Sequence, residues 1–219
     1  MIQNYCEKFV VADDHTAILD GTCLSLRTQY RDAQITTTTK AYEVETLVET
    51  IGPDVLIMDL SMPEKGQETA CTETGLNVLR SLFKKFPDLN IVVQTVHGAR
   101  LIRLKPSIDR HQGGFIIADK SLSQAEMLVK VGWAMHGLLY TPPEMRVGLE
   151  IKPEWLELLK LAFIDGLTDR AISERMHRTE RCIRHYWRGV QNALEVYPDK
   201  QLNLRVQTYN KARHIGMLD

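Results

Sequence analysis

Four short runs of consecutive apolar residues constrain the fold of this chain more than any other feature of its sequence. The runs are residues 9–12, 55–58, 91–93 and 115–118. Runs that are this short, rich in β-branched residues and without polar alternation are typical of strands buried on both faces. Segments with helical periodicity separate the runs, which predicts a parallel sheet with helices on both faces, the α/β doubly wound class.

The remaining pattern predicts further elements and a division into two domains. Helices are expected over residues 16–30, 43–51, 74–86 and 123–136, and an additional strand at or near a sheet edge over 34–39. The last of these helices opens with a capping box, Ser123 followed by Glu126. After Pro142 and Pro143 only helical patterns remain. We therefore expect one domain over 1–138, a linker over 139–152 and a small all-α domain over 153–219.

Composition excludes several classes of protein. Of the 219 residues, 44% are hydrophobic and 25% are charged, which is ordinary globular usage and argues against wholesale disorder. The net charge of −1 argues against a protein that coats nucleic acid without specificity. No apolar run approaches the roughly 18 residues that a membrane helix needs, and no signal peptide is visible. The expectation is a cytoplasmic protein without membrane contact.

Carboxylates follow two of the predicted strands. Asp13 and Asp14 come after the first run, Asp59 comes after the second, and Thr95 follows the third. The carboxyl ends of parallel strands meet at one edge of a sheet, so these side chains are expected to converge. Clustered carboxylates suit Mg²⁺, and a carboxylate beside Mg²⁺ can attack phosphorus to form an aspartyl phosphate. The alternative reading is that each aspartate only caps a turn.

Two segments resemble the receiver domains of bacterial two-component response regulators. They are Val11-Ala12-Asp13-Asp14-His15 and Asp54-Val55-Leu56-Ile57-Met58-Asp59-Leu60-Ser61-Met62-Pro63, and the resemblance covers about residues 8–140. It implies a flavodoxin-like fold, a sensor histidine kinase as partner and Asp59 as phosphoacceptor. It further implies Mg²⁺ bound by Asp13, Asp14, Asp59 and the backbone carbonyl of Ser61, with Thr95 as the switch hydroxyl and Phe115 as the switch aromatic.

The chain departs from the receiver pattern at three places. The lysine that ends the last strand in the family aligns with Ala118. Lys120 lies two residues on, on the same face if the strand continues, and is the candidate to replace that lysine as a switch residue. Val96 stands where the family prefers a small residue, and residues 64–74 form a longer connection than usual. That connection carries Glu64, Glu68, Cys71 and Glu73. These departures leave open an atypical receiver that is not phosphorylated and is controlled by protein partners or another signal.

The C-terminal region has the pattern of a helix-turn-helix. A short helix is predicted over 168–176, with Thr168 as its N-cap, and a long helix follows from about 179 to 196. On the long helix Arg181, Arg184 and Arg188, with His185 adjacent, lie on a different face from the apolar residues. A cationic face opposite a packed one allows a helix to enter the major groove of DNA. A solvated charged face is the alternative.

The same region resembles the LuxR-type helix-turn-helix of many response regulators. The matching stretches include Asp165-Gly166-Leu167-Thr168, Ala171-Ile172-Ser173-Glu174-Arg175-Met176 and Thr179-Glu180-Arg181-Cys182-Ile183-Arg184. The resemblance implies promoter DNA as ligand and a homodimer on DNA. The residues expected to contact DNA are Arg178, Thr179, Arg181, Arg184, His185 and Arg188.

We therefore expect a transcriptional regulator whose receiver controls DNA binding or dimerisation, and not an enzyme. Phosphatases of the haloacid dehalogenase type also use an aspartate at a strand end as nucleophile. They need a second aspartate two residues on as general acid, and that position holds Ser61 here. A phosphatase is the less favoured alternative.

Overall fold

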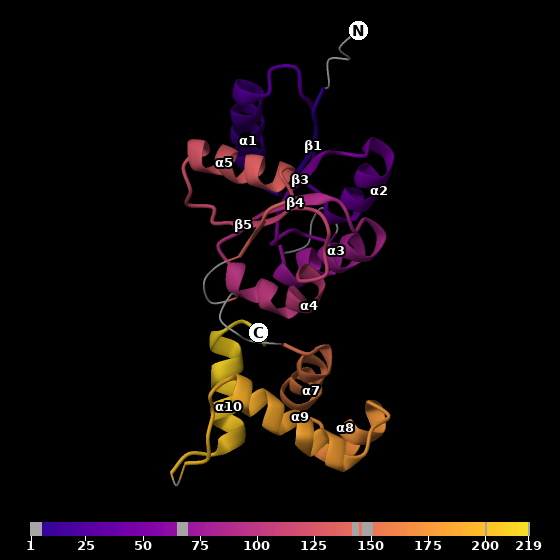
Figure 1. Ribbon diagram of the computed structural model, residues 1–219, viewed down its shortest axis with the longest axis vertical. Helices are drawn as coiled ribbons and strands as arrows, with labels where there is room; N and C mark the ends of the chain where they lie inside the picture. The colour runs from indigo at the N-terminus through magenta and orange to yellow at the C-terminus, as the bar shows by residue number, and fades with distance from the viewer. Residues whose placement is uncertain (1–5, 65–69, 142–144, 146–150, 200, 219) are drawn as a thin grey trace. The chain divides into compact units, whose positions relative to one another are not determined.

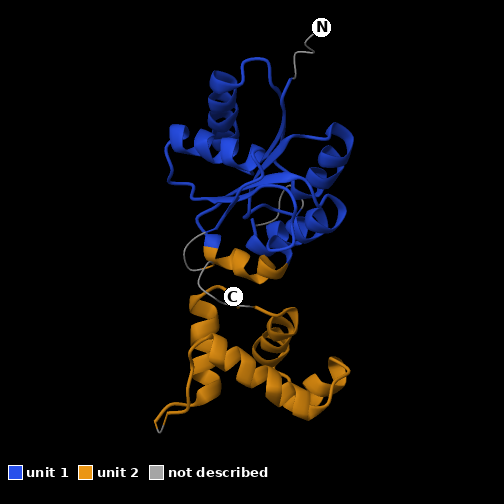
Figure 2. Cartoon of the chain, viewed as in Figure 1, with its two compact units in different colours: residues 1–98, 107–142 blue, residues 99–106, 143–219 orange. Residues whose placement is uncertain are grey.

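The computed structural model describes residues 6–64, 70–141, 145, 151–199 and 201–218. The chain forms two compact units, coloured in Figure 2: unit 1 contains residues 1–98 and 107–142, and unit 2 contains residues 99–106 and 143–219. The change from one unit to the other at 142/143 falls within the expected linker. Pro142 and Pro143, on which that expectation depends, lie outside the described residues.

Unit 1 is built on a six-stranded sheet in which every described pairing is parallel. The strand order is β2-β1-β3-β4-β5-β6. The strands are β1 Lys8–Ala12, β2 Gln34–Thr38, β3 Val55–Asp59, β4 Asn90–Gln94, β5 Phe115–Ala118 and β6 Leu139–Tyr140. All residues of β3 and β5 are buried, whereas β2 at one edge is mostly half-exposed. The predicted doubly wound α/β fold is confirmed.

Helices cover both faces of this sheet. They are α1 Thr16–Gln29, α2 Ala41–Ile51, α3 Thr72–Lys85 and α5 Gln124–Met135. Between β4 and β5 the chain also forms a 3-10 helix over Gly98–Leu104 and the short α4 over Lys105–Ile108, and residues 99–106 of this segment belong to unit 2. Helix α1 packs beside α5 on one side of the sheet, and α2 packs beside α3 on the other (Figure 1). The capping box at Ser123 and Glu126 is present as predicted.

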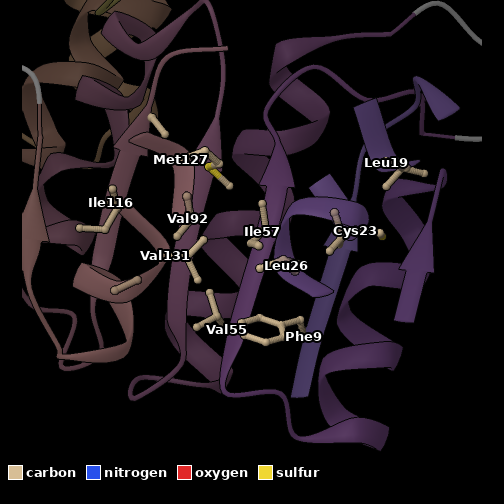
Figure 3. Packing of buried hydrophobic residues seen from close by; sticks show 13 residues of the cluster. Phe9, Leu19, Cys23, Leu26, Val55, Ile57, Val92, Ile116, Met127 and Val131 are labelled. Atoms are coloured by element: carbon tan, nitrogen blue, oxygen red, sulfur yellow. The ribbon is translucent and has the colours of Figure 1, made fainter. Parts of the chain in front are cut away.

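The core under α1 and α5 follows the two-residue repeat of a strand. Phe9, Val55, Ile57, Val92 and Ile116 project from alternate positions of four adjacent strands into one cluster. Leu26, Met127 and Val131 reach the same cluster from the two helices, as Figure 3 shows. Because both faces of the central strands are covered in this way, those strands can be apolar at every position.

Gly75 of α3 sets the distance between that helix and the end of β3. A Cβ atom added at Gly75 would penetrate the carbonyl oxygen of Leu60 and would lie 2.7 Å from its carbonyl carbon. Gly75→Ala should therefore lower the free energy of unfolding by about 2 kcal/mol, although alanine favours helix. Urea unfolding measures the effect. Gly132→Ala in α5 is the control, since a Cβ there meets nothing within 4 Å; equal effects at the two sites would contradict this account.

His111 gives the stability of unit 1 a pH dependence. Its Nε2 donates to the carbonyl oxygen of Leu89 at 2.7 Å, and its ring contacts Phe83 edge-on. Its Nδ1 is buried and has no hydrogen-bond partner among the described residues. Burial lowers the pKa of His111 below its ordinary value, because the bond to Leu89, which favours the protonated form, offsets burial only in part.

The sign of this pH dependence follows from the lowered pKa. The unfolded chain takes up a proton at His111 before the folded chain does, so the histidine stabilises the fold above its ordinary pKa of 6.5 and loses that effect as the pH falls. We expect the unfolding midpoint in urea to drop between about pH 7 and about pH 5, and to drop less in His111→Gln. His136→Gln, at an exposed histidine, should keep the wild-type slope; a His111→Gln slope equal to it would contradict the assignment.

The described part of unit 2 from residue 151 onward contains four helices. They are α7 Pro153–Phe163, α8 Asp169–Arg175, α9 Glu180–Ala193 and α10 Leu204–His214. Trp187 of α9 lies at its centre, with Phe163 edge-on at 5.6 Å, and Phe163 in turn contacts Tyr209 at 5.2 Å. Helix α9 ends before the predicted residue 196, because Glu195 adopts a left-handed backbone with φ 54°. None of the helices in the described part of the chain is long and apolar enough to cross a membrane.

Three elements of the described structure were not predicted from the sequence. Strand β6 occupies Leu139 and Tyr140, which were assigned to the linker, and it pairs with Phe115 and Ile116. A strand of two residues is too short to show periodicity, so only its pairing reveals it. The 3-10 helix over Gly98–Leu104 and the short α4 over Lys105–Ile108 are the others. Each is shorter than the window over which a helical period can be read from a sequence.

Candidate functional site

Three neighbouring strands bring the predicted acidic residues to one edge of the sheet. Ala12 of β1 lies beside Met58 of β3, and Asp59 lies beside Gln94 of β4. Asp13 follows directly after β1, and Asp59 is the last residue of β3. Both aspartates are almost completely buried, at 2% and 4% exposure. The convergence that the sequence predicts is therefore present, and it places two carboxylates in a desolvated site.

Lys120 joins these two carboxylates. Its Nζ lies 2.8 Å from Oδ2 of Asp13 and 2.8 Å from Oδ2 of Asp59, and its side chain is 17% exposed. Strand β5 ends at Ala118, so Lys120 does not reach the site by continuing the strand. It reaches the site from the following turn, in which the backbone N–H of Ser121 donates to Oδ1 of Asp119 at 2.8 Å.

The charges of this triad are set by burial and by its internal bonds. Burial raises the pKa of Asp59 above its ordinary value, and the bonds from Lys120 and from the Ser61 backbone oppose burial only in part. Burial by itself lowers the pKa of Lys120, but the bonds to Asp13 and Asp59 outweigh burial and raise it. Lys120 therefore stays protonated, and its charge is what allows two buried carboxylates to lie side by side.

The donor set fits a hard divalent cation. Asp13, Asp14, His15 and Asp59 each offer a ligand atom, and these atoms lie within 4.8 Å of one another. Oδ1 of Asp14 is buried without a hydrogen bond in the described structure. The Nδ1 atom of His15 is 2.8 Å from that oxygen but is not aligned for a hydrogen bond. A buried carboxylate oxygen without a hydrogen bond, beside two further carboxylates, is what Mg²⁺ would satisfy.

The predicted switch residues occupy two different places. Thr95 is buried just after β4; its N–H donates to the carbonyl of Ala118, and its Oγ1 accepts from the N–H of His97 at 3.0 Å. Phe115 begins β5, three residues before Ala118, and packs against Phe83 at 5.4 Å. Thr95 therefore lies at the edge of the sheet that carries the acidic residues, whereas Phe115 is fully buried away from that edge.

The connection after Asp59 is only partly described. The backbone N–H of Ser61 donates to Oδ1 of Asp59 at 3.1 Å, and Met62 forms an antiparallel bridge with Cys71. Glu64 is exposed, and Glu73 pairs with Arg80 at 3.1 Å. Glu68 lies outside the described residues. Val96 is 63% exposed, so its side chain does not fill the buried site.

The helix-turn-helix pattern of the sequence corresponds to α8, a four-residue turn and α9. Thr168 caps α8 by accepting from the N–H of Ala171, and Thr179 caps α9 by accepting from the N–H of Cys182 at 3.3 Å. The turn contains His177, whose backbone is left-handed with φ 52°. The predicted boundaries of both helix starts agree with these caps.

Helix α9 has two opposite faces. Ile183, Trp187 and Val190 are buried, whereas Arg181, Arg184, His185 and Arg188 are exposed. Arg184 pairs loosely with Glu180 at 3.6 Å, and both side chains are more than half exposed. Arg178 lies in the turn, where its Nη1 donates to the carbonyl oxygen of His177 at 3.3 Å. The exposed cationic residues of α9 thus form one strip, with Arg178 at its start.

Unit 1 is a parallel sheet with an acidic pocket at its carboxyl edge, and a lysine joins two carboxylates of that pocket. This combination of fold and site defines a class of signalling α/β domains, and unit 1 conforms to it. A family model described as the response regulator receiver domain matches residues 9–129. The chain therefore belongs to the response regulator receiver family.

Curated relatives match parts of the chain. The transcriptional regulatory protein YhcZ of Bacillus subtilis is 32% identical over 88 residues, which cover 40% of this chain and 37% of that protein. The oxygen regulatory protein NreC of Staphylococcus carnosus is 29% identical over 142 residues, which cover 65% of this chain and 61% of that protein. The chain thus spans less than two thirds of the length of each of these relatives.

Solved structures share the fold across almost the whole chain. The alignment with the two-component response regulator RcsB in complex with DNA covers 95% of this chain and 98% of the RcsB chain, at 20% identity and a TM-score of 0.56. The alignment with RcsB of Salmonella typhimurium covers 94% of this chain and 99% of that RcsB chain, at 20% identity and a TM-score of 0.58. At this level of identity the likeness shows the fold.

Sequence reasoning missed one polar cluster in unit 2. The Asp169 carboxylate accepts hydrogen bonds from the side chains of Trp187 and Arg205. From the sequence, Asp169 is expected only as a member of the helix over 168–176, and Arg205 carries no expected role. The only signal in the sequence was an acidic residue directly after the N-cap, which is common in helices that make no such contacts.

Proposed function

We propose that this chain is a DNA-binding transcriptional response regulator whose receiver domain is phosphorylated at Asp59. One observation carries the proposal: Lys120 contacts Asp13 and Asp59 at 2.8 Å although the position that aligns with the family lysine is an alanine. The cation that a receiver requires next to its phosphoacceptor is therefore supplied from the turn after β5. A sensor histidine kinase is the partner that such a site implies.

The chemistry is a phosphoryl transfer to a carboxylate. An oxygen of Asp59 attacks the phosphorus of a phosphohistidine, the phosphorus–nitrogen bond breaks, and the histidine leaves and takes up a proton. Mg²⁺, when bound by Asp13, Asp14, Asp59 and the carbonyl of Ser61, would neutralise charge on the phosphoryl oxygens. Lys120 then exchanges its bond to Oδ2 of Asp59 for one to a phosphoryl oxygen, and Thr95 is placed after β4 to donate its hydroxyl.

Unit 2 supplies the DNA-binding part of the proposal. Helix α9 presents Arg181, Arg184, His185 and Arg188 to solvent and is held on its opposite face by the core of the unit. Arginine can bond guanine bidentately or hold phosphates, so this strip fits the major groove of promoter DNA. Two copies of the chain on DNA would place two such helices about one helical turn apart. A cytoplasmic location accords with this function.

The experiment tests whether receiver chemistry controls DNA affinity. A duplex that the wild-type chain enriches from a random pool is titrated by fluorescence anisotropy, before and after treatment with Mg²⁺ and a small acyl phosphate. We expect treatment to change the affinity of the wild type and not that of Asp59→Asn. A regulator with an unphosphorylated receiver would bind the duplex equally before and after treatment, and a chain that enriches no duplex would contradict DNA binding itself.

A further inference from the structure

We infer that Asp169 is a positioning residue that sets the orientation of α9, and with it the direction in which the arginine strip faces DNA. The inference rests on the proposed DNA-binding function and adds to it a residue outside the strip. Asp169 is the first residue of α8, and its carboxylate contacts side chains from α9 and from α10.

The contacts of Asp169 join three helices through one group. Oδ1 accepts from Nε1 of Trp187 in α9 at 3.0 Å and from Nη2 of Arg205 in α10 at 3.0 Å. Oδ2 lies 2.8 Å from the same Nη2 of Arg205. Both oxygens are therefore occupied, and the hydrogen bond from the indole reaches the carboxylate in a fixed direction.

Arg205 contacts the indole of Trp187 as well as the carboxylate of Asp169. Its guanidinium carbon lies 3.4 Å from the centre of the Trp187 ring, so the planar cation stacks on the ring while it binds the carboxylate. Burial lowers the pKa of Arg205, and Asp169 opposes this shift. Trp187 itself is 3% exposed and meets Phe163 edge-on. The ring is thus held by its N–H, its face and its edge.

This constraint acts on the arginine strip because Trp187 belongs to the same rigid helix. Trp187 lies directly before Arg188 and three residues after Arg184, so the indole and these arginines are carried by neighbouring positions of α9. A rotation of α9 about its axis would move the indole away from Asp169 and turn the strip by the same angle. Apolar contacts alone tolerate such a rotation more easily, because they are not directional.

The exposure of the ion pair indicates that its role is geometric more than stabilising. The Asp169 side chain is 35% exposed and the Arg205 side chain is 39% exposed. Ion pairs with this degree of exposure contribute little to the free energy of unfolding, because solvent screens them. Base readout, in contrast, depends on the angle and distance of each arginine, so a small change in helix orientation is enough to disturb it.

The test compares Asp169→Ala with Glu174→Ala in the full chain. Glu174 also lies on α8, and its carboxylate pairs with Arg170 at 3.4 Å on the exposed surface. Each substitution removes one negative charge from the same helix, so charge alone predicts slightly tighter DNA binding for both. We expect Asp169→Ala instead to weaken binding to the enriched duplex about tenfold, the value of one bidentate arginine–base pair. Its affinity for a scrambled duplex should change much less.

Spectroscopy separates positioning from a general loss of structure. The indole N–H signal of Trp187 in a two-dimensional NMR spectrum, assigned with Trp187→Phe, should shift in Asp169→Ala and remain near its wild-type position in Asp169→Asn. The amide oxygen introduced by Asp169→Asn still accepts from the indole, but the ion pair to Arg205 is removed, so DNA affinity should be intermediate. The urea unfolding midpoint of Asp169→Asn should stay close to that of the wild type, whereas Asp169→Ala, which leaves the buried indole N–H without its acceptor, should unfold at a lower urea concentration.

The outcomes are distinguishable. If Asp169→Ala binds the enriched duplex as tightly as Glu174→Ala does, the inference is overturned while DNA binding stands. If Asp169→Ala does not fold, Asp169→Asn decides, and wild-type selectivity in that variant overturns the inference. If the wild type enriches no duplex, the proposed function fails first, and the indole signal still reports whether Asp169 holds Trp187.

Discussion

We expect the wild-type chain to take up one phosphoryl group from a small acyl phosphate in the presence of Mg²⁺, and Asp59→Asn to take up none. Measurement of the intact mass of both chains checks this expectation. The amide of asparagine is not a nucleophile for phosphorus at neutral pH, so the expected effect is complete loss. The buried position of Asp59, between the ammonium of Lys120 and the backbone N–H of Ser61, provides the electrostatic setting for transfer.

Lys120→Ala extends this prediction to the displaced lysine. Removal of the ammonium leaves Asp13 and Asp59 buried without their shared cation, and the phosphorylated form loses its partner for a phosphoryl oxygen. The rate at which the chain takes up the phosphoryl group should fall by about a hundredfold or more. This is the size of effect seen when an active site loses one donor that stabilises charge in the transition state. Lys84→Ala, an exposed lysine of α3, should label as the wild type does.

Three results would contradict this account of the acidic site. Labelling of Asp59→Asn at the wild-type rate would show that another carboxylate is the acceptor. Wild-type labelling of Lys120→Ala would show that the lysine in this structure only neutralises the pocket. If the wild type itself remains unlabelled while Mg²⁺ still binds, the receiver is an atypical one that is not phosphorylated.

The second large effect is expected from the arginine strip. Replacement of Arg181, Arg184 and Arg188 by alanine should weaken DNA binding by at least about a hundredfold, since each arginine that bonds a base or phosphate contributes about 1–3 kcal/mol. The slope of the logarithm of affinity against the logarithm of salt concentration should fall by about one for each phosphate that the variant no longer neutralises. These side chains are exposed, so the unfolding midpoint should change little.

A matched triple variant separates local contacts from net charge. Arg27, Arg31 and Lys84 are exposed residues of unit 1, and their replacement by alanine changes the charge of the chain by the same amount. This variant should retain most of the affinity and the salt slope of the wild type. Equal losses of affinity in the two triple variants would show that binding follows overall charge, and α9 would then not be the recognition helix.

Some parts of the molecule were determined by the sequence because their signals are local. The central strands needed only their own apolar, β-branched residues to be recognised, since burial on both faces removes any need for alternation. The starts of α5, α8 and α9 were visible because Ser123, Thr168 and Thr179 cap helices within their own turn. Asp13 and Asp59 could be brought together because parallel strands share one carboxyl edge.

Tertiary structure alone decided the parts that depend on distant contacts. The sequence made Lys120 a candidate for the missing lysine, but its contacts with Asp13 and Asp59 depend on the turn after β5 and not on a continued strand. Strand β6 exists only through its pairing with β5. Asp169, Trp187 and Arg205 lie on three different helices and meet because those helices pack around one indole. Local sequence specifies elements and their ends, whereas side chains far apart in the chain acquire their partners only when packing places them in reach.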